Sequence, residues 1–234
     1  MKILCTICAR KASKGIKNKA QKKINGRSLI EISIKQAFLS KLFDEIVVST
    51  DSKKIQSIAN KCGAKSWFLR SKKLSNDKIS KIPVIKDIFQ KSEIRFKKKF
   101  DICIDLDVTS PLRKIEDIKS ALRLFLKKKK TQNLFSVCKS RKNPYFNMIE
   151  VKNKTVSLVK KSKNLFKVTN RQSAPQVFDM NASIYIWKRS TILKSKKLFN
   201  KYTDIYVMPQ SRSIDIDSYF DLEVIRLISK KKNA

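Results

Sequence analysis

Short apolar runs along the chain predict the strands of a buried sheet. The first run is residues 3–9, ILCTICA. Six later segments are also rich in apolar and β-branched residues, a pattern typical of parallel strands with both faces covered. These segments are residues 45–50, 65–69, 101–106, 134–138, 182–187 and 204–208.

Between the runs, apolar residues recur at helical spacing. Ile30, Ile34 and Ala37 lie at i, i+4 and i+7, so they mark one face of a helix. Comparable stripes predict further helices within residues 52–62, 81–91, 115–125 and 220–228. The alternation of strands and helices predicts an α/β protein, with one Rossmann-like three-layer α/β/α domain over residues 1–234 and a mainly parallel sheet.

The segment at residues 143–165 interrupts this alternation. Residues 146–151 and 155–159 flank Lys152, Asn153 and Lys154, and the pattern predicts an inserted β-hairpin. In doubly wound sheets, ligands bind beyond the carboxyl ends of the strands. We therefore expect the chemistry to lie at Asp51 and in the loops at residues 10–19, 105–113 and 215–217.

The charge of the chain is strongly positive. Its formal net charge is +36, from 55 Lys and Arg against 19 Asp and Glu, and only 11 of the basic residues are arginine. Lysines spread over the whole chain indicate a solvated surface, although a nucleic-acid-binding protein is an alternative interpretation. Few arginines stand beside aromatic residues, and this disfavours the alternative.

The absence of histidine and the spacing of the cysteines limit the kinds of catalytic and metal site that the chain can form. The chain has no histidine, which excludes the commonest general base and zinc ligand. Five cysteines at irregular spacing are not a disulfide framework, and the pair Cys5 and Cys8 lies within a predicted buried strand. No apolar stretch reaches the roughly 18 residues that span a bilayer. We expect a cytoplasmic protein without a membrane segment.

Three segments carry candidate chemistry. The loop at residues 9–19, ARKASKGIKNK, could present backbone N–H groups and cations to phosphates. Asp215 and Asp217 lie at i and i+2 and could share Mg²⁺, or Asp217 could merely cap the last helix. The segment at residues 105–113, DLDVTSPLR, contains a second acidic pair, Asp105 and Asp107.

Taken together and in order, these motifs resemble the acylneuraminate cytidylyltransferases over essentially the whole chain. The matching segments are ARKASKGI, EIVVSTDS, TSPLR, NRQSAPQ, MNASIYI and SIDID. CTICAR, GIKNK, NPYFNMIE and RQSAPQVFDMNASIYIW are most similar to the branch that includes CMP-legionaminate synthetases. The resemblance implies a nucleotide-diphospho-sugar transferase fold and an enzyme that couples a nonulosonic acid to CMP from CTP, for cell-surface glycan synthesis.

The resemblance also implies roles for individual residues. Arg10, Lys14, Asp215 and Asp217 would be catalytic, with the two aspartates binding Mg²⁺ or Mn²⁺. The nucleotide would contact Arg10, Ser13, Lys14, Gly15, Lys19 and Arg70. The acidic nine-carbon sugar would contact Asp107, Arg171, Gln172, Asn181 and Tyr185. The enzyme would be a homodimer, with the inserted hairpin reaching the partner subunit.

The chain departs from the family pattern at several of these positions. Lys11 and Ala12 stand where many members have two glycines, and Asp107 and Asp179 stand where Gln and Arg are common. The sugar is therefore open between N-acetylneuraminate, legionaminate and related acids. Because a carboxylate at Asp107 could pair with the donor edge of guanine, a guanylyltransferase acting on another sugar is an alternative.

Overall fold

The structure is a computed structural model that describes residues 1–13, 15–160, 168, 170 and 172–231. Its main sheet has six strands in the order β10-β6-β9-β5-β1-β4. The bounds are β1 Ile3–Cys8, β4 Glu45–Ser49, β5 Ile102–Leu106, β6 Asn133–Lys139, β9 Phe178–Lys188 and β10 Thr203–Val207. Neighbouring strands are parallel except β9, which runs antiparallel to both β5 and β6. The predicted fold class, α/β with a mainly parallel sheet, is confirmed.

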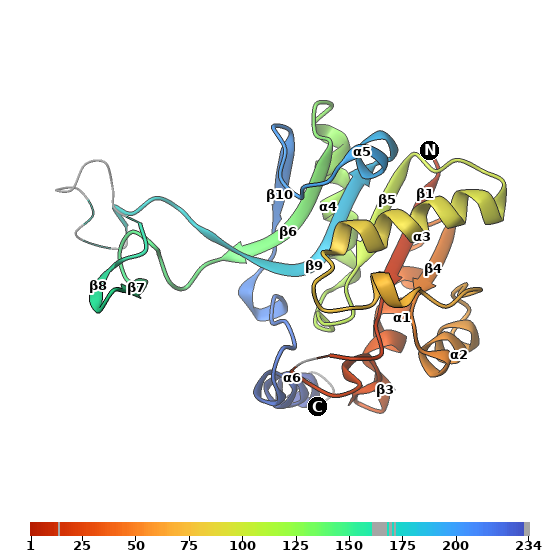
Figure 1. The fold of residues 1–234 in the computed structure, drawn as a ribbon, viewed down its shortest axis with the longest axis horizontal. Coiled ribbons are helices and arrows are strands. Elements are labelled where there is room, and N and C mark those ends of the chain that lie inside the picture. The colour runs from red at the N-terminus through yellow and green to blue at the C-terminus, as the bar shows by residue number, and fades with distance from the viewer. Residues whose placement is uncertain (14, 161–167, 169, 171, 232–234) are drawn as a thin grey trace.

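Helices cover both faces of the sheet (Figure 1). Their bounds are α1 Leu29–Ser40, α2 Lys53–Lys61, α3 Lys81–Phe96, α4 Ile115–Lys127, α5 Arg189–Lys194 and α6 Tyr219–Lys231. One core cluster joins Ile3 and Cys5 of β1 to buried residues of α1, α2, α4 and α6. The other joins Leu4 of β1 to buried residues of α3 and α5. Consecutive β1 side chains thus enter opposite layers, which explains the unbroken apolar run in the sequence.

One predicted strand is wrong. Residues 65–69 form only two isolated bridges, Lys65 to Val47 of β4 and Leu69 to Thr50 just after it. Between the bridges, Ser66 exchanges two hydrogen bonds with the side-chain amide of Asn60, at 2.9 Å and 3.1 Å. The backbone of Ser66 is therefore satisfied by α2, which interrupts the ladder with β4.

The inserted segment forms a hairpin that extends away from the sheet (Figure 1). Its strands are β7 Ile149–Lys152 and β8 Thr155–Leu158, with the turn at Asn153 and Lys154 in left-handed conformations. The predicted first strand began earlier, but residues 146–148 donate their backbone N–H groups to Asn143 and form a turn instead. Residues 161–165 of the predicted insertion lie outside the described residues.

A smaller hairpin, β2 Lys23–Ile24 with β3 Arg27–Ser28, joins the first loop to α1. The five cysteines are all free, and none of the described helices is long and apolar enough to cross a membrane. Burial raises the pKa of the Cys5, Cys8 and Cys103 thiols well above the ordinary value. These thiols are therefore protonated and unreactive at neutral pH.

Candidate active site

A cavity of about 370 Å³ opens beyond the carboxyl ends of β1 and β5. This is the edge of the sheet where doubly wound folds bind ligands. Its wall includes residues from the loop after β1, from the segment leading into α3, from the loop after β5 and from the segment before α6. Those that the argument uses are Arg10, Ser13, Gly15, Lys19, Arg70, Asp77, Lys81, Asp107, Thr109 and Asp217.

The loop after β1 forms the basic wall. Arg10 makes an ion pair with Asp77 across the cavity. The backbone N–H of Lys11 donates to Asp51 at 2.6 Å, which fixes the start of the loop to the segment after β4. Lys11 and Ala12, which replace the common glycines, have exposed side chains. Lys14 lies outside the described residues.

Gly15 and Lys19 tie this loop to the acidic segment before α6. A Cβ atom at Gly15 would lie 2.0 Å from the backbone oxygen of Asp217, so only glycine fits this approach. The Lys19 ammonium donates to the Ile216 carbonyl and, at 2.9 Å, to the Asp217 carboxylate. The predicted phosphate loop and Asp217, one of the two predicted metal ligands, therefore form one continuous wall.

The helix-cap interpretation of Asp217 is wrong. Ser218 precedes α6, and its hydroxyl accepts from the Asp221 N–H at 3.3 Å, while the Asp221 carboxylate accepts from the Ser218 N–H at 2.7 Å. This reciprocal pair satisfies the start of the helix. The Asp217 carboxylate is exposed and turns to Lys19 instead.

The Asp215 carboxylate is half-buried. Its Oδ1 atom is buried and has no hydrogen-bond partner in the described part of the chain. Burial, with a smaller effect of the nearby Asp107 carboxylate, raises the pKa of Asp215 to about 6, although Thr109 and Lys19 act to lower it. An acidic oxygen in this condition is one that a cation would stabilise.

The donor set suits a hard cation that shares its coordination with substrate. No group of three His, Cys, Asp or Glu side chains that could hold a metal occurs among the described residues. Mg²⁺ is often bound by only one or two carboxylates, with substrate phosphates and water completing its coordination. Asp215 and Asp217, beside a basic loop, match that mode of binding.

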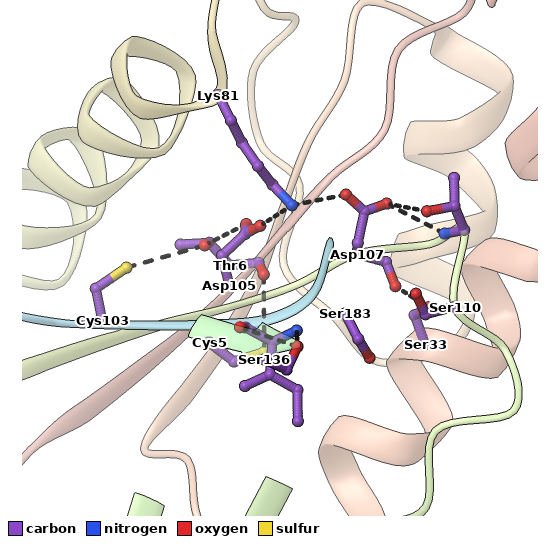
Figure 2. A network of polar contacts seen from close by, with 12 residues as sticks. Cys5, Thr6, Ser33, Lys81, Cys103, Asp105, Asp107, Ser110, Ser136 and Ser183 are labelled. Atoms are coloured by element: carbon purple, nitrogen blue, oxygen red, sulfur yellow. Dashed lines mark hydrogen bonds and ion pairs between the residues drawn. The ribbon is translucent and has the colours of Figure 1, made fainter. Parts of the chain in front are cut away.

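Lys81 and Asp107 line the cavity and belong to a charged network with Asp105 (Figure 2). The Lys81 ammonium, from the first residue of α3, lies 3.0 Å from Asp105 Oδ2 and 2.6 Å from Asp107 Oδ2. Asp105 is fully buried and also accepts from the Thr6 hydroxyl at 2.7 Å. Burial would lower the pKa of Lys81, but the two carboxylates raise it well above its ordinary value. Lys81 is therefore charged.

Arg70 also lines the cavity. It is buried, its backbone N–H donates to the Thr50 carbonyl at 2.8 Å, and its Nε atom donates to the Ser75 hydroxyl at 3.3 Å. Arg70 is thus held partly by Thr50, the residue that follows β4. Its contact with the nucleotide base stays a prediction.

Of the other predicted sugar contacts that the structure describes, only Tyr185 touches this charged network, with its ring centroid 4.2 Å from the Lys81 ammonium. Asn181 is buried, where its amide accepts from Ser136 at 2.7 Å and donates to Ser213 at 3.0 Å, so it is used inside the fold. Tyr185 is also buried, and its ring stacks on Trp187. Gln172 is exposed in a turn. Arg171 lies outside the described residues, and all four roles stay predictions.

Sequence reasoning missed Lys81 and Asp77. Asp77 faces Arg10, and Lys81 bridges the acidic pair at the end of β5. The unpaired charges of Asp105 and Asp107 in a buried strand end were a signal that a cation must approach them. The sequence, with lysines throughout, gives no indication of which one does.

Comparison with known proteins agrees with this geometry. Residues 4–229 match the cytidylyltransferase family model. The chain is 47% identical to CMP-N,N'-diacetyllegionaminic acid synthase of Campylobacter jejuni over 99% of this chain and 96% of that protein. It is 46% identical, with the same coverage, to post-translational flagellin modification protein B of Campylobacter coli.

A solved structure shows the same fold at much lower identity. It is CMP:2-keto-3-deoxy-manno-octonic acid synthetase complexed with CTP, with a TM-score of 0.71 and 16% identity. The alignment covers 99% of this chain and 100% of that one. The family match spans nearly the whole chain, and with it the loop, the acidic pair and the cavity between them. The chain belongs to the cytidylyltransferase family.

Proposed function

We propose that the protein transfers the cytidylyl group of CTP to a nonulosonic acid of the legionaminate or sialate type, giving a CMP-sugar and pyrophosphate. The observation that carries this proposal is the junction of the basic loop with Asp217 at one cavity, where the Lys19 ammonium donates to the Asp217 carboxylate. The identity to CMP-N,N'-diacetyllegionaminic acid synthase makes N,N'-diacetyllegionaminate the first substrate to test. The CMP-sugar would supply glycan or flagellin modification, from a cytoplasmic enzyme with access to CTP.

The residues of the chain would bind and neutralise the triphosphate. Arg10, Lys14 and Lys19, with the backbone around Ser13 and Gly15, would hold the phosphates, and Arg70 would lie near the base. Asp215 and Asp217 would hold Mg²⁺, or Mn²⁺, which supplies Lewis-acid stabilisation of phosphate charge when bound. Because the reaction needs alignment and charge neutralisation rather than a covalent nucleophile, a site without histidine suffices.

The reaction that follows is an in-line displacement at phosphorus. The anomeric hydroxyl of the sugar forms a bond to the α-phosphorus, the bond to the bridging oxygen breaks, and pyrophosphate leaves. The hydroxyl proton is released to solvent. Arg10 would offset the charge that develops on the leaving pyrophosphate.

The exposed hairpin supports a homodimer. Cross-strand pairs place Ile149 opposite Leu158 and Val151 opposite Val156, so these four apolar side chains share one face. All four are exposed in the single chain. A contiguous apolar face on an extended element marks an interaction surface, and a second copy of the chain is the partner we propose.

A substrate panel tests the proposed function. The purified protein is incubated with Mg²⁺, one of CTP, GTP, UTP or ATP, and one of N,N'-diacetyllegionaminate, N-acetylneuraminate or pseudaminate. We expect CMP-sugar by mass detection with CTP and a nonulosonic acid. Product formation with GTP alone would favour the guanylyltransferase alternative. Absence of product with every pair, together with salt-dependent nucleic-acid binding, would favour the other alternative.

A further inference from the structure

The Lys81 ammonium lies between two carboxylates and an aromatic ring. It donates a hydrogen bond to Asp107 Oδ2 at 2.6 Å, makes an ion pair with Asp105 Oδ2 at 3.0 Å, and lies 4.2 Å from the centroid of the Tyr185 ring. Because Lys81 lines the cavity, it can act on a ligand there through a neighbour that it holds in place.

That neighbour is Asp107, which has one acceptor position open. Its Oδ1 atom accepts from the Thr109 N–H at 3.1 Å and the Thr109 hydroxyl at 3.0 Å, and Oδ2 accepts from Lys81. An ionised carboxylate has about four acceptor positions, so one remains on Oδ2. Burial would raise the pKa of Asp107, but Lys81 lowers it below the ordinary value overall. The open position accepts a donor and repels an anion.

Asp107 lies close to the proposed metal ligand Asp215. Its charge raises the pKa of Asp215. Thr109, whose N–H and hydroxyl hold the Asp107 carboxylate, accepts the Ile216 N–H at 3.0 Å through its backbone carbonyl. A group that meets Asp107 therefore lies close to the proposed metal site. Phosphate oxygens are acceptors, whereas a sugar offers hydroxyl and amide N–H donors.

We propose that Lys81 is a positioning residue for the acceptor sugar. It holds the Asp107 carboxylate in one orientation, so that the remaining lone pair of Oδ2 accepts a hydroxyl or amide N–H of the sugar (Figure 2). This inference rests on the proposed function. It adds a prediction of substrate selectivity. A sugar that carries a hydroxyl or amide N–H donor opposite Asp107 binds more tightly than its analogue without that donor.

The first test is Lys81→Met, which keeps the length of the side chain and removes its charge. We expect the KM for the sugar to rise roughly tenfold, because a charge-assisted hydrogen bond loses its geometry. The KM for CTP should change less than about twofold. Lys81→Arg keeps the charge and should restore most of the sugar KM. A rise in the CTP KM alone, or no change in either, overturns the inference.

A second variant controls for a loss of folding in Lys81→Met. Asp105 is fully buried, and Lys81→Met leaves it without its cation. Lys81→Met with Asp105→Asn removes that buried charge and keeps an acceptor for Thr6. The double variant should fold and show the same rise in sugar KM. An unchanged KM in the folded double variant overturns the inference.

A matched control exists on the same helix. Lys91 makes an ion pair with Asp87 at 2.9 Å and lies 4.2 Å from the centroid of the Phe68 ring, contacts close to those of Lys81 but away from the cavity. Lys91→Met should leave both KM values unchanged. A similar rise in sugar KM in this control would show a general effect of charge or stability and would contradict the assignment.

A double-mutant cycle separates positioning from direct contact. If Lys81 acts through Asp107, adding Lys81→Met to Asp107→Ala changes the sugar KM less than about twofold. Full additivity of the two effects contradicts the inference. A failure of the proposed function can be told apart from a failure of this inference, because the wild-type protein would then form no CMP-sugar at all.

Discussion

The backbone of Gly15 lies so close to the carbonyl of Asp217 that a single methyl group would not fit between them, since the nearest distance from a built Cβ to that oxygen is 2.0 Å. This contact joins the loop after β1 to the segment before α6. Lys19 reinforces it through the Asp217 carboxylate. Backbone packing thus fixes the distance between the loop proposed to bind phosphate and the aspartate proposed to bind metal.

Gly15→Ala should separate the two walls. We expect turnover to fall roughly 100-fold, because a displacement of about 1 Å at a reacting centre has effects of that size. Pyrophosphate release at saturating substrate measures it.

Gly26→Ala is the matched control. Gly26 has a φ of 80° and nothing within 4 Å of an added Cβ. It should lose about 1 kcal/mol of unfolding free energy but keep its turnover. Equal turnover in both variants would contradict the role given to the Gly15 contact.

Asp215→Asn tests the metal site. The substitution keeps the shape of the side chain and removes its charge, so Mg²⁺-dependent turnover should fall roughly 1000-fold. The metal-free variant should unfold at an equal or higher urea concentration, because a buried charge without a partner is lost. Turnover near the wild-type value, with the same dependence on Mg²⁺, would refute the site.

We expect Lys19 to compete with a metal cation for the Asp217 carboxylate. In the nucleotide-free protein, Lys19→Met should bind Mn²⁺ several-fold more tightly, because a positive charge 2.9 Å from the carboxylate is removed. Calorimetry or electron paramagnetic resonance of Mn²⁺ measures this without turnover. Lys17→Met, at an exposed position of the same loop, removes a charge without that contact. A gain of equal size in Lys17→Met would show only a general field effect.

The hairpin predicts an oligomeric state. Val151→Glu places a charge on the apolar face, so the mass in solution by light scattering should fall from that of a dimer to that of a monomer. Ser157→Glu changes the opposite, polar face and should leave the dimer intact. A wild-type protein that is monomeric at every concentration, or a Val151→Glu dimer, would contradict the proposed interface.

Much of the fold followed from the sequence for a physical reason. Strands of a sheet covered on both sides are apolar throughout, so β1, β4 and β5 stood out as runs, and the stripe of Ile30, Ile34 and Ala37 marked α1. The strand predicted at residues 65–69 was wrong because the spacing of apolar residues shows only which side chains suit a strand. It does not show that the Asn60 side-chain amide forms hydrogen bonds with the backbone of Ser66.

The site was predictable only in part. Ordered motifs indicated the loop with Gly15, Asp107 and the pair at Asp215 and Asp217, because these segments end strands or begin helices at one edge. Lys81 was not predictable, since one lysine among so many carries no signal of its own. Asn181 differs from Lys81, because it lies in a distinctive sequence motif. Its side-chain amide nevertheless forms hydrogen bonds with Ser136 and Ser213 inside the buried core.

The most direct test of the account follows the phosphate itself. CTP carrying an isotopic label in its α-phosphate is incubated with Mg²⁺, N,N'-diacetyllegionaminate and the wild-type protein or Asp215→Asn. The account predicts that the wild-type protein moves the label into CMP-sugar with one pyrophosphate released for each transfer, and that Asp215→Asn does not. Label found only in free CMP, or equal transfer by both proteins, would contradict it.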